Sequence, residues 1–260
     1  MWYVFEVETW DAYMNMALDS ALVIYARKNP GFKAIRFFRF EGPGAITLER
    51  YQDYREVSPE CEKLGVCYVR RPTGGRGLYH HPTDLAYSVV APRSEFKDHL
   101  ASIYTINRWV VNALKELDIE AKHNKSQSIL VNGRKIAASA QNNTKNPLLQ
   151  HGSVFYEPTW RRASLILPPI EYNKFTSIKE QNPDVSLDDV SSAFFESFKK
   201  DKSENSVHST IPEEIKSIAV RLVEKRYGTE KWNNKEGVSR GNCAGIWGTY
   251  RERPEPEKII

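Results

Sequence analysis

Cysteine is scarce in this chain, and its three copies show no spacing typical of a disulfide framework or a metal site: Cys61, Cys67 and Cys243. Disulfide-rich secreted proteins and zinc-finger-like modules are therefore excluded. The simplest interpretation is a protein of a reducing compartment, and we expect it to be cytoplasmic.

Long hydrophobic runs and a strong charge of one sign are also missing. No stretch approaches the roughly 18 to 20 apolar residues that a transmembrane helix needs. Residues 1–8 alternate and carry acidic side chains, so they predict a strand and not a signal peptide. The net charge of +4 is too small to indicate a nucleic-acid partner, although a mild positive bias suits an acidic protein or an anionic cofactor. We expect neither a membrane nor a nucleic acid as a partner.

Several common catalytic signatures are absent as well. The chain has no P-loop, no G-x-G-x-x-G fingerprint and no G-x-S-x-G nucleophile elbow. Three histidines, His80, His81 and His151, lack a further ligand at a familiar spacing, so we assign no metal ligand.

What the sequence does contain is a regular succession of strands and helices. Apolar patterning predicts strands over residues 1–8, Lys33–Arg39, Ala45–Leu48, Val66–Arg70, Asp84–Val90, Ile129–Val131, Lys135–Gln141 and His151–Tyr156. Helical spacing predicts helices over Asp11–Val23, Glu60–Leu64, Ile103–Leu117, Leu187–Phe198 and Pro212–Tyr227. Asn132-Gly133 suits a hairpin turn, Ser186 suits a helix N-cap, and the polar segment Lys199–Ser209 suits a loop. The predicted class is α+β: a mixed sheet with flanking helices and a small helical part after about residue 160.

Two motifs carry most of the functional information. The first is RRPTGGRGLYH over Arg70–His80, in which a strand delivers two arginines into a Gly-Gly turn. Glycine lets the backbone approach a phosphate closely, and arginine offers a bidentate fork. Gly-Gly turns are common, so by itself the motif is compatible with phosphate binding or with an ordinary turn.

The second motif is NGRKIAASAQ over Asn132–Gln141, followed by QHGS over Gln150–Ser153. It places Lys135 between a polar turn and a strand. An isolated strand lysine is usually just an exposed surface residue. Beside a phosphate-binding turn, however, a lysine can face the reactive phosphate or thioester of an activated acyl group, and the two motifs together indicate a protein that handles such a group.

In this order the motifs resemble those of the lipoate–protein ligase A and octanoyltransferase family, relatives of the biotin protein ligases. Further segments carry the resemblance: Met14–Asp19, Arg36–Arg39, Leu48–Gln52, Asp84–Ser88 and Tyr227–Asn233. It implies a mixed-sheet catalytic domain over residues 1–233 that binds lipoate or octanoate in a tunnel. Residues 234–260 are then a tail or docking segment.

The activity that the resemblance implies is that of a lipoate–protein ligase. In such ligases ATP, with Mg²⁺, and lipoate or octanoate form an acyl-adenylate, and the acyl group passes to a lysine of a lipoyl acceptor domain. Two alternatives remain open. One is octanoyl or lipoyl transfer from a carrier protein, and the other is a non-catalytic lipoyl-binding assembly subunit.

The resemblance also implies roles for individual residues. Lys135 is implied as the catalytic residue that contacts the α-phosphate and the carboxyl oxygen, where a fixed cation stabilises the developing negative charge. Nucleotide or adenylate contacts are implied for Arg71, Gly74, Gly75, Gly77, Leu78 and His80, with Arg71 and the Gly74–Gly75 turn facing the phosphate and Gly77 and Leu78 the adenine side. Residues implied to line the acyl pocket are Arg70, His151 and Gly152.

The chain departs from the family pattern at several positions. Gln127-Ser128 stands where ligases usually have Asn-Asp, whose carboxylate helps to hold Mg²⁺. Arg76 replaces a third glycine, and His81 replaces an acidic residue. The octanoyltransferase branch uses a cysteine nucleophile, but neither His123–Ser128 nor Leu148–Gln150 contains cysteine. An acyl-cysteine mechanism thus lacks its nucleophile, whereas a ligase can obtain metal coordination from water and phosphate, so we favour the ligase.

The expected partner is an acidic lipoyl acceptor domain that presents its lysine on a hairpin. Basic residues predicted around the cleft are Arg70, Arg76, Lys122, Lys125 and Arg134. Only 27 residues follow Asn233, too few for the large accessory domain of long ligases. We therefore expect either a separate accessory subunit or an enzyme that works without one.

Overall fold

The computed structural model of the chain describes residues 1–124, 128–142, 146–167, 171–202 and 206–235, except for the side chains of Tyr172 and Lys202. The strands are β1 (Trp2–Trp10), β2 (Lys33–Phe40), β3 (Ala45–Leu48), β4 (Cys67–Arg70), β5 (Leu78–His80), β6 (Leu85–Ala91), β7 (Lys122–His123), β8 (Ser128–Val131), β9 (Arg134–Asn142), β10 (Leu148–Val154) and β11 (Ser206–Ser209). The helices are α1 (Ala12–Lys28), α2 (Glu60–Lys63), α3 (His99–Lys115), α4 (Trp160–Ile166), α5 (Ile178–Gln181), α6 (Leu187–Lys202), α7 (Glu213–Leu222) and α8 (Glu230–Asn233), with a π-helical turn, Val223–Tyr227, after α7.

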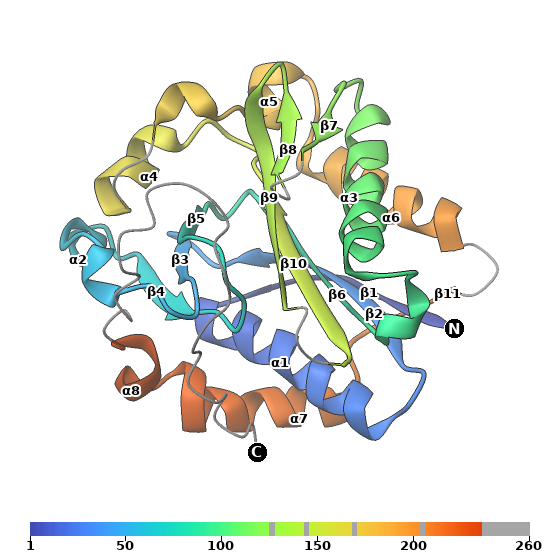
Figure 1. Cartoon of the computed structure of the whole chain (residues 1–260). Helices are drawn as coiled ribbons and strands as arrows, with labels where there is room; N and C mark the ends of the chain where they lie inside the picture. The colour runs from blue at the N-terminus through green and yellow to red at the C-terminus, as the bar shows by residue number, and fades with distance from the viewer. Residues whose placement is uncertain (125–127, 143–145, 168–170, 203–205, 236–260) are drawn as a thin grey trace.

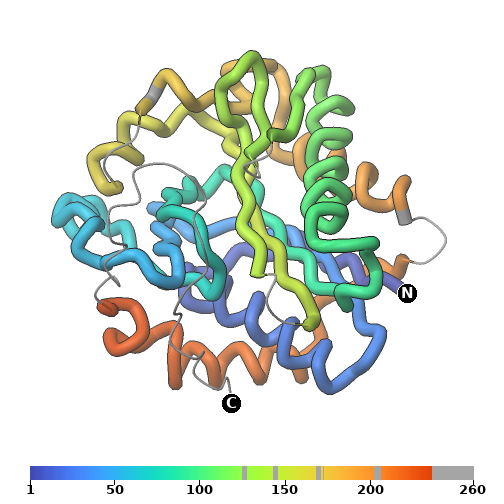
Figure 2. Tube along the Cα trace, viewed as in Figure 1, coloured from blue at the N-terminus to red at the C-terminus, as the bar shows by residue number. Residues whose placement is uncertain are grey.

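The strands form two sheets of unequal size (Figure 1). The larger has the order β11-β1-β2-β6-β10-β9-β8-β7, and the smaller has the order β4-β3-β5. The pairs β11–β1 and β1–β2 are parallel, whereas the pairs from β2 to β7 are antiparallel. The large sheet is thus mixed, as the sequence predicts, and β9 and β10 form the long hairpin that crosses the centre of Figure 2.

Helices cover both faces of the large sheet. In Figure 1, α1 and α7 lie together against one face, and α3 and α6 lie together against the other. The alternation of β2 explains how each face receives its own core: Ile35 and Phe37 pack toward α3 and α6, whereas Phe38 and Phe40 pack toward α1. The same alternation points Arg36 to the α1 face, where it meets Asp19.

The small sheet has a core of its own. Ile46, Leu48 and Tyr79 of this sheet pack with residues of α2 and α4, among them Cys61 and Ile166. The small sheet, α2 and α4 lie side by side at one end of the molecule in Figure 1. This end carries the Arg70–His80 motif, because β4 enters the glycine turn and β5 leaves it.

Most predicted elements are confirmed, but the C-terminal third differs from the expectation. The segment Lys199–Ser209 was expected to be a loop, and this prediction is wrong: α6 continues to Lys202, and β11 pairs in parallel with β1. Val207 on β11 is 38% exposed, so the strand lacks the buried alternation that would have marked it. The helical part after residue 160 packs onto the faces of the same sheet, since α6 contributes Phe198 to one core and α7 contributes Ile215 to the other.

Three further elements near the motif were not predicted, β5, α4 and α8. Ser186 caps α6 as expected, because its hydroxyl accepts from the Asp189 amide and the Asp189 carboxylate accepts from the Ser186 amide. Within the ranges given above, no helix combines the length and hydrophobicity needed to cross a bilayer.

Candidate active site

The glycine turn between β4 and β5 is built around the side chain of Arg71. Its guanidinium donates to the carbonyl oxygens of Gly74 (2.7 Å), Arg76 (2.8 Å) and Thr47 (2.9 Å). Arg71 is only 6% exposed, and burial lowers the pKa of its guanidinium to about 10. Arg71 therefore lies inside the turn, and its implied contact with a phosphate stays a prediction.

The contacts of Arg71 determine where the turn amides point. In a trans peptide the C=O and N–H groups point in opposite directions. Because the carbonyls of Gly74 and Arg76 point at Arg71, the N–H groups of Gly75 and Gly77 point away from it. In the part of the chain that the structure describes, neither N–H has an acceptor. Outward amides in a glycine turn are donors of the kind that bind anions.

A buried chain of polar groups continues inward from the turn. The Thr73 hydroxyl accepts from Arg71 Nε at 3.1 Å and lies 2.6 Å from His151 Nε2. His151 Nδ1 lies 2.7 Å from Asp19 Oδ2, and Asp19 Oδ1 accepts from Arg36 Nη2 at 3.1 Å. The turn, β10, α1 and β2 are thereby connected through polar side chains that are all buried.

His80 approaches the same arginine from the other side. Its Nε2 lies 2.9 Å from the Thr47 hydroxyl, which accepts from Arg71 Nη1 at 3.3 Å. Its ring stacks on Phe40 with 4.4 Å between centroids. Burial, with the charge of Arg71 next in importance, lowers the pKa of His80 to about 3, so the imidazole is neutral at physiological pH. Arg71 is thus held by two threonines, each backed by a buried histidine.

Arg70 has a different surrounding from Arg71. Its guanidinium is fully buried and donates to six backbone carbonyl groups, those of Glu49, Arg50, Gln52, Trp232, Asn233 and Lys235. The side chain joins β4 to the segment after β3 and to the end of the described chain. Its role in the acyl pocket stays a prediction, because the structure commits its donors to the backbone.

Lys135 lies further along β9, in an aromatic environment. Its Nζ is 5.5 Å from the centroid of Phe175, whose ring lies 5.2 Å from that of Trp160. The structure gives Lys135 Nζ no hydrogen bond and no ion pair with any described residue. Partial burial lowers the pKa of this ammonium group. A half-buried cation without an anionic partner is suited to receiving one from a ligand.

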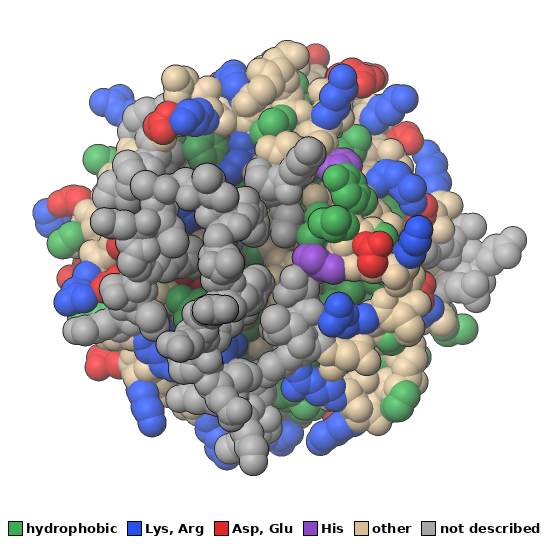
Figure 3. Space-filling model, in the orientation of Figure 1, with side chains coloured by type: hydrophobic (Ala, Val, Ile, Leu, Met, Phe, Trp, Pro, Cys, Tyr) green, Lys and Arg blue, Asp and Glu red, His purple; other side chains and the backbone are tan. Residues whose placement is uncertain are grey.

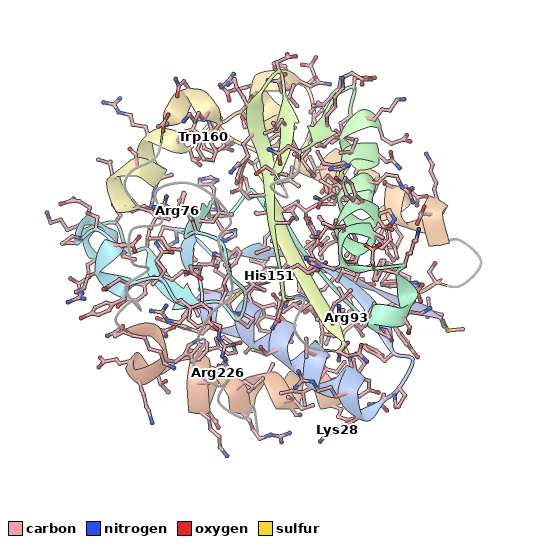
Figure 4. The ribbon with its side chains drawn as sticks, viewed as in Figure 1. Lys28, Arg76, Arg93, His151, Trp160 and Arg226 are labelled. Carbon is pink, nitrogen blue, oxygen red and sulfur yellow. The ribbon has the colours of Figure 1, made fainter. Side chains whose placement is uncertain are left out.

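Lys135 and the glycine turn come from different parts of the fold, and α4 lies beside both. Trp160 at the start of α4 contacts Phe175 beside Lys135. Leu167, just after α4, lies so close to Gly77 that a Cβ there would be 2.9 Å from Leu167 Cδ2. His151 pairs with Ala140 of β9. Ala140 lies five residues from Lys135 along this strand, so the Cα atoms of Ala140 and Lys135 are roughly 17 Å apart. In Figure 4, His151 lies at the centre of the molecule, with Arg76 and Trp160 on the side of the small sheet and α4.

The remaining predicted site residues take backbone roles. Gly152 on β10 permits close packing, because a Cβ there would be 2.6 Å from both the Ala138 oxygen and the Tyr87 hydroxyl. Leu78 opens β5 and pairs with Thr47 of β3. Gly74 has open space around it, since a Cβ would meet nothing within 4 Å.

Several participants escaped the sequence analysis. Asp19 was named only within a predicted helix and the Met14–Asp19 segment of the resemblance, although a carboxylate among buried residues of an apolar helix is a signal for a polar partner. Thr73 lies within the Arg70–His80 motif but was given no role, and Thr47 carries no sequence signal, because the roles of both depend on which side chains surround Arg71. Phe175 lies in a segment without regular patterning.

The thiols of the described residues do not meet the requirements of an acyl-carrying nucleophile. Cys61 belongs to the small core, and burial raises its pKa to about 11. Burial also raises the pKa of Cys67 on β4. A nucleophilic cysteine needs a lowered pKa. Cys243 lies outside the described residues.

A divalent metal needs several oxygen or nitrogen ligands from neighbouring side chains. Among the described ranges no group of three His, Cys, Asp or Glu side chains could hold a metal ion. Ser128, at the position of the usual carboxylate, has a hydroxyl side chain and is buried, and Gln127 lies outside the described residues. The described residues therefore offer no preformed cluster that would hold Mg²⁺ by protein side chains alone, and a metal ion brought with ATP would depend on water and phosphate oxygens.

The predicted basic rim is only partly a surface feature. Arg70 is buried, and Arg134 forms an ion pair with Glu180 at 3.0 Å while donating to the Phe175 carbonyl. Arg76 and Lys122 are exposed, and Lys125 lies outside the described residues. On the face in Figure 3, Lys and Arg side chains are spread around the margin instead of forming one patch.

Comparison with known proteins identifies relatives of this chain. Residues 11–199 match the family described as the lipoyl protein ligase A/B catalytic domain. The chain is 29% identical over 257 residues to octanoyltransferase LipM of Carboxydothermus hydrogenoformans, covering 84% of this chain and 93% of that protein. It is 30% identical over 241 residues to lipoate-protein ligase A subunit 1 of Thermoplasma acidophilum, covering 85% and 91%. Among solved structures, a lipoate-protein ligase A bound with ATP has a TM-score of 0.77 at 25% identity, covering 89% of this chain and 97% of that one.

Proposed function

This chain belongs to the lipoyl protein ligase A/B catalytic-domain family, and we propose that it is a lipoate–protein ligase acting through an acyl-adenylate. The enzyme condenses lipoate or octanoate with ATP and transfers the acyl group to a lysine of a lipoyl acceptor domain. The observation that carries the proposal is the half-buried ammonium of Lys135, which forms no hydrogen bond or ion pair with any described residue, because acyl activation needs a fixed cation beside the reacting carboxyl and phosphate groups.

The chemistry has two steps. The carboxylate of the acid attacks the α-phosphorus of ATP, a C–O–P linkage forms, and pyrophosphate leaves. The amine of the acceptor lysine then attacks the acyl carbonyl, a C–N bond forms, AMP leaves with the C–O bond electrons, and the amine proton passes to solvent. Lys135 stabilises the negative charge on the carbonyl oxygen and phosphate in both steps. The outward amides of Gly75 and Gly77 donate to the phosphate oxygens.

The thiols support a ligase over an acyl-cysteine enzyme. A transferase of that kind needs a reactive thiolate, whereas burial raises the pKa of both described cysteines. Direct attack on an adenylate needs no thiol. The acceptor is supported by a solved bi-partite lipoate protein ligase with its E2 lipoyl domain from Thermoplasma acidophilum, and its two-part organisation supports a separate accessory subunit here.

Intact-mass measurement tests the proposal directly. The full chain is incubated with an acceptor domain and lipoate or octanoate, with and without Mg-ATP, and a candidate accessory chain is added in a parallel series. We expect an acyl increment on the acceptor only when ATP is present, together with AMP release. An increment that forms without ATP from an octanoyl carrier protein contradicts the ligase.

Octanoyl transfer is the second candidate, because several of the curated relatives are named octanoyltransferase LipM. It requires either a thiol outside the described residues or direct transfer between the two carrier proteins. Cys243→Ser distinguishes these routes: lost transfer from octanoyl carrier protein identifies an acyl-cysteine enzyme, and full transfer leaves the direct route. Binding of an acyl-adenylate with no product under any condition would identify a non-catalytic lipoyl-binding subunit.

A further inference from the structure

The buried chain from Asp19 to Arg71 has one self-consistent arrangement of protons. Asp19 accepts from Arg36 and, as the carboxylate partner of that guanidinium, has no proton to donate. The 2.7 Å contact to His151 therefore requires a proton on His151 Nδ1. At the other end Arg71 Nε can only donate, so the Thr73 oxygen accepts from it.

The donor in the hydrogen bond between Thr73 and His151 follows from where the Thr73 hydroxyl proton can go. If His151 Nε2 carried a proton, the Thr73 hydroxyl proton would have no acceptor among the described residues. Thr73 is only 1% exposed, and a buried hydroxyl without a partner is costly. The consistent arrangement is a neutral His151 with its proton on Nδ1, accepting from Thr73 through Nε2.

We propose that Asp19, His151 and Thr73 form a positioning relay that fixes Arg71 and so aims the amides of Gly75 and Gly77 at the acyl-phosphate group. The inference rests on the proposed function for the identity of the ligand only. Arg71 is the link, because the same guanidinium that donates to Thr73 holds the Gly74 and Arg76 carbonyls inward. None of the three relay residues needs to touch the substrate.

The relay joins parts of the chain that local structure does not bring together. Asp19 comes from α1, His151 from β10, and Thr73 from the turn, and the contacts span 132 and 78 residues of sequence. A preformed anion site costs less to organise on binding than a flexible turn. The tip of the turn at Gly75 and Arg76 is exposed, so its shape depends on what holds it from beneath.

The first test reads the proton on His151. Nitrogen-15 NMR of histidine-labelled full chain, assigned with His151→Gln, distinguishes the Nδ1–H form from the Nε2–H form and from imidazolium. We expect Nδ1–H at neutral pH, with or without any ligand. An Nε2–H ring or an imidazolium at His151 would overturn the relay, whatever the protein's activity.

The second test separates phosphate binding from acid binding. Affinities for octanoyl-sulfamoyl-adenosine and for octanoate are compared in wild type, Thr73→Val and Thr73→Ser. We expect Thr73→Val to weaken binding of the adenylate analogue by about 10- to 150-fold, the effect of losing one hydrogen bond between a turn amide and a charged phosphate oxygen, with octanoate affinity changed much less. Thr73→Ser keeps the hydroxyl and should recover most of the loss.

Thr83→Val is the matched control. Its hydroxyl also lies within hydrogen-bond distance of a histidine, 2.7 Å from His81 Nδ1, but outside the contacts of Arg71. Thr83→Val should bind the analogue like wild type. Equal loss in Thr73→Val and Thr73→Ser, or equal loss for octanoate and analogue, would mean general damage to the fold and would overturn the relay.

The outcomes also separate this inference from the proposed function. If wild type binds no adenylate analogue while His151 shows the Nδ1–H form, the ligase proposal fails and the proton arrangement stands. If wild type binds the analogue but Thr73→Val binds equally well, the relay fails and the ligase proposal is unaffected.

Discussion

At the scale of single residues, the cationic side chains of the site differ in whether their donors are already hydrogen-bonded within the fold. Arg70 and Arg71 follow each other in sequence, yet both guanidinium groups are occupied by backbone carbonyls. Among the residues that the structure describes, Lys135 Nζ contacts the ring of Phe175 and forms no hydrogen bond or ion pair. Charge in a motif is therefore a poor guide to catalysis until the partners of each group are known.

Replacing Lys135 by methionine removes the charge while keeping most of the volume. We expect acyl transfer to fall by roughly 30- to 1,000-fold, the equivalent of about 2–4 kcal/mol of transition-state stabilisation. Single-turnover transfer to an acceptor domain measures it. Lys174→Met is the control, because Lys174 is exposed, directly precedes Phe175 in sequence and forms an ion pair with Glu171. Its transfer rate should be near that of wild type. A Lys135→Met enzyme with wild-type rates would remove the central role assigned here.

The two neighbouring glycines of the turn should differ in their tolerance to alanine. Gly75 has φ +108°, and a Cβ would lie 2.9 Å from Arg71 Nη2, whereas a Cβ at Gly74 meets nothing within 4 Å. Gly75→Ala should destabilise the fold by about 1–2 kcal/mol through backbone strain and should also displace Arg71. Denaturant titration and transfer assays should show a larger loss for Gly75→Ala than for Gly74→Ala. The opposite order would contradict the described turn.

At the scale of elements, β4 is hydrogen-bonded to the last residues of the described chain. Beyond the contacts of the Arg70 side chain, the Trp232 indole donates to the Arg70 carbonyl at 2.9 Å, and Asn233 Oδ1 accepts from the Arg70 amide. Tyr68 on β4 donates to Asn234. The packed region continues to Lys235, and residues 236–260 lie outside the described residues, so the predicted boundary at residue 233 stays a prediction.

Arg70→Lys tests how much the hydrogen bonds of the Arg70 guanidinium stabilise the fold. Lysine has three donors for six carbonyl groups, so several buried acceptors would lose their partners at about 1–3 kcal/mol each, not fully additive. We expect a loss of at least about 3 kcal/mol in the free energy of unfolding, measured by denaturant titration. Arg27→Lys, on the exposed side of α1, should change it by less than about 0.5 kcal/mol. A small effect at Arg70 would mean that solvent replaces its donors.

At the scale of the whole molecule, two buried groups should give opposite responses to pH. Burial lowers the pKa of His80 to about 3, from 6.5, so the unfolded chain binds this proton more readily and stability falls as pH drops below about 6.5. Burial raises the pKa of Asp84 to about 7, from 3.8, so the folded chain binds that proton more readily and stability falls as pH rises from 3.8 toward 7. Between about pH 4 and 6.5 the two effects oppose each other.

Asp84→Asn should therefore uncover the acid sensitivity that His80 contributes. Relative to wild type, the stability of the variant should decline on acidification by about 1.4 kcal/mol for each pH unit between roughly 6.5 and 4. Urea titrations over this range measure the slope separately from any uniform loss caused by the Asn side chain. Glu120→Gln, at an exposed carboxyl group, is the control. Parallel profiles for wild type and Asp84→Asn would contradict the shifted pKa.

The sequence by itself determined most of the local structure and the place of the two motifs. Helical and strand periodicity is a local property, so α1, β3, β6 and α3 could be predicted within a few residues. Asn132-Gly133 takes positive φ at both residues, as a hairpin turn of its type requires. The resemblance of the motifs also led to the family that the comparison found.

Only the tertiary structure decided which polar groups meet. The sequence places Thr73 and His151 in the two motifs and Asp19 in a helix, but it does not show that they contact one another, because these contacts depend on α1, the turn and β10 being packed together. The burial of Arg70 likewise follows from α8 closing over β4. β11 was missed because an edge strand with exposed residues owes its existence to pairing with β1, a long-range interaction that a local pattern does not encode.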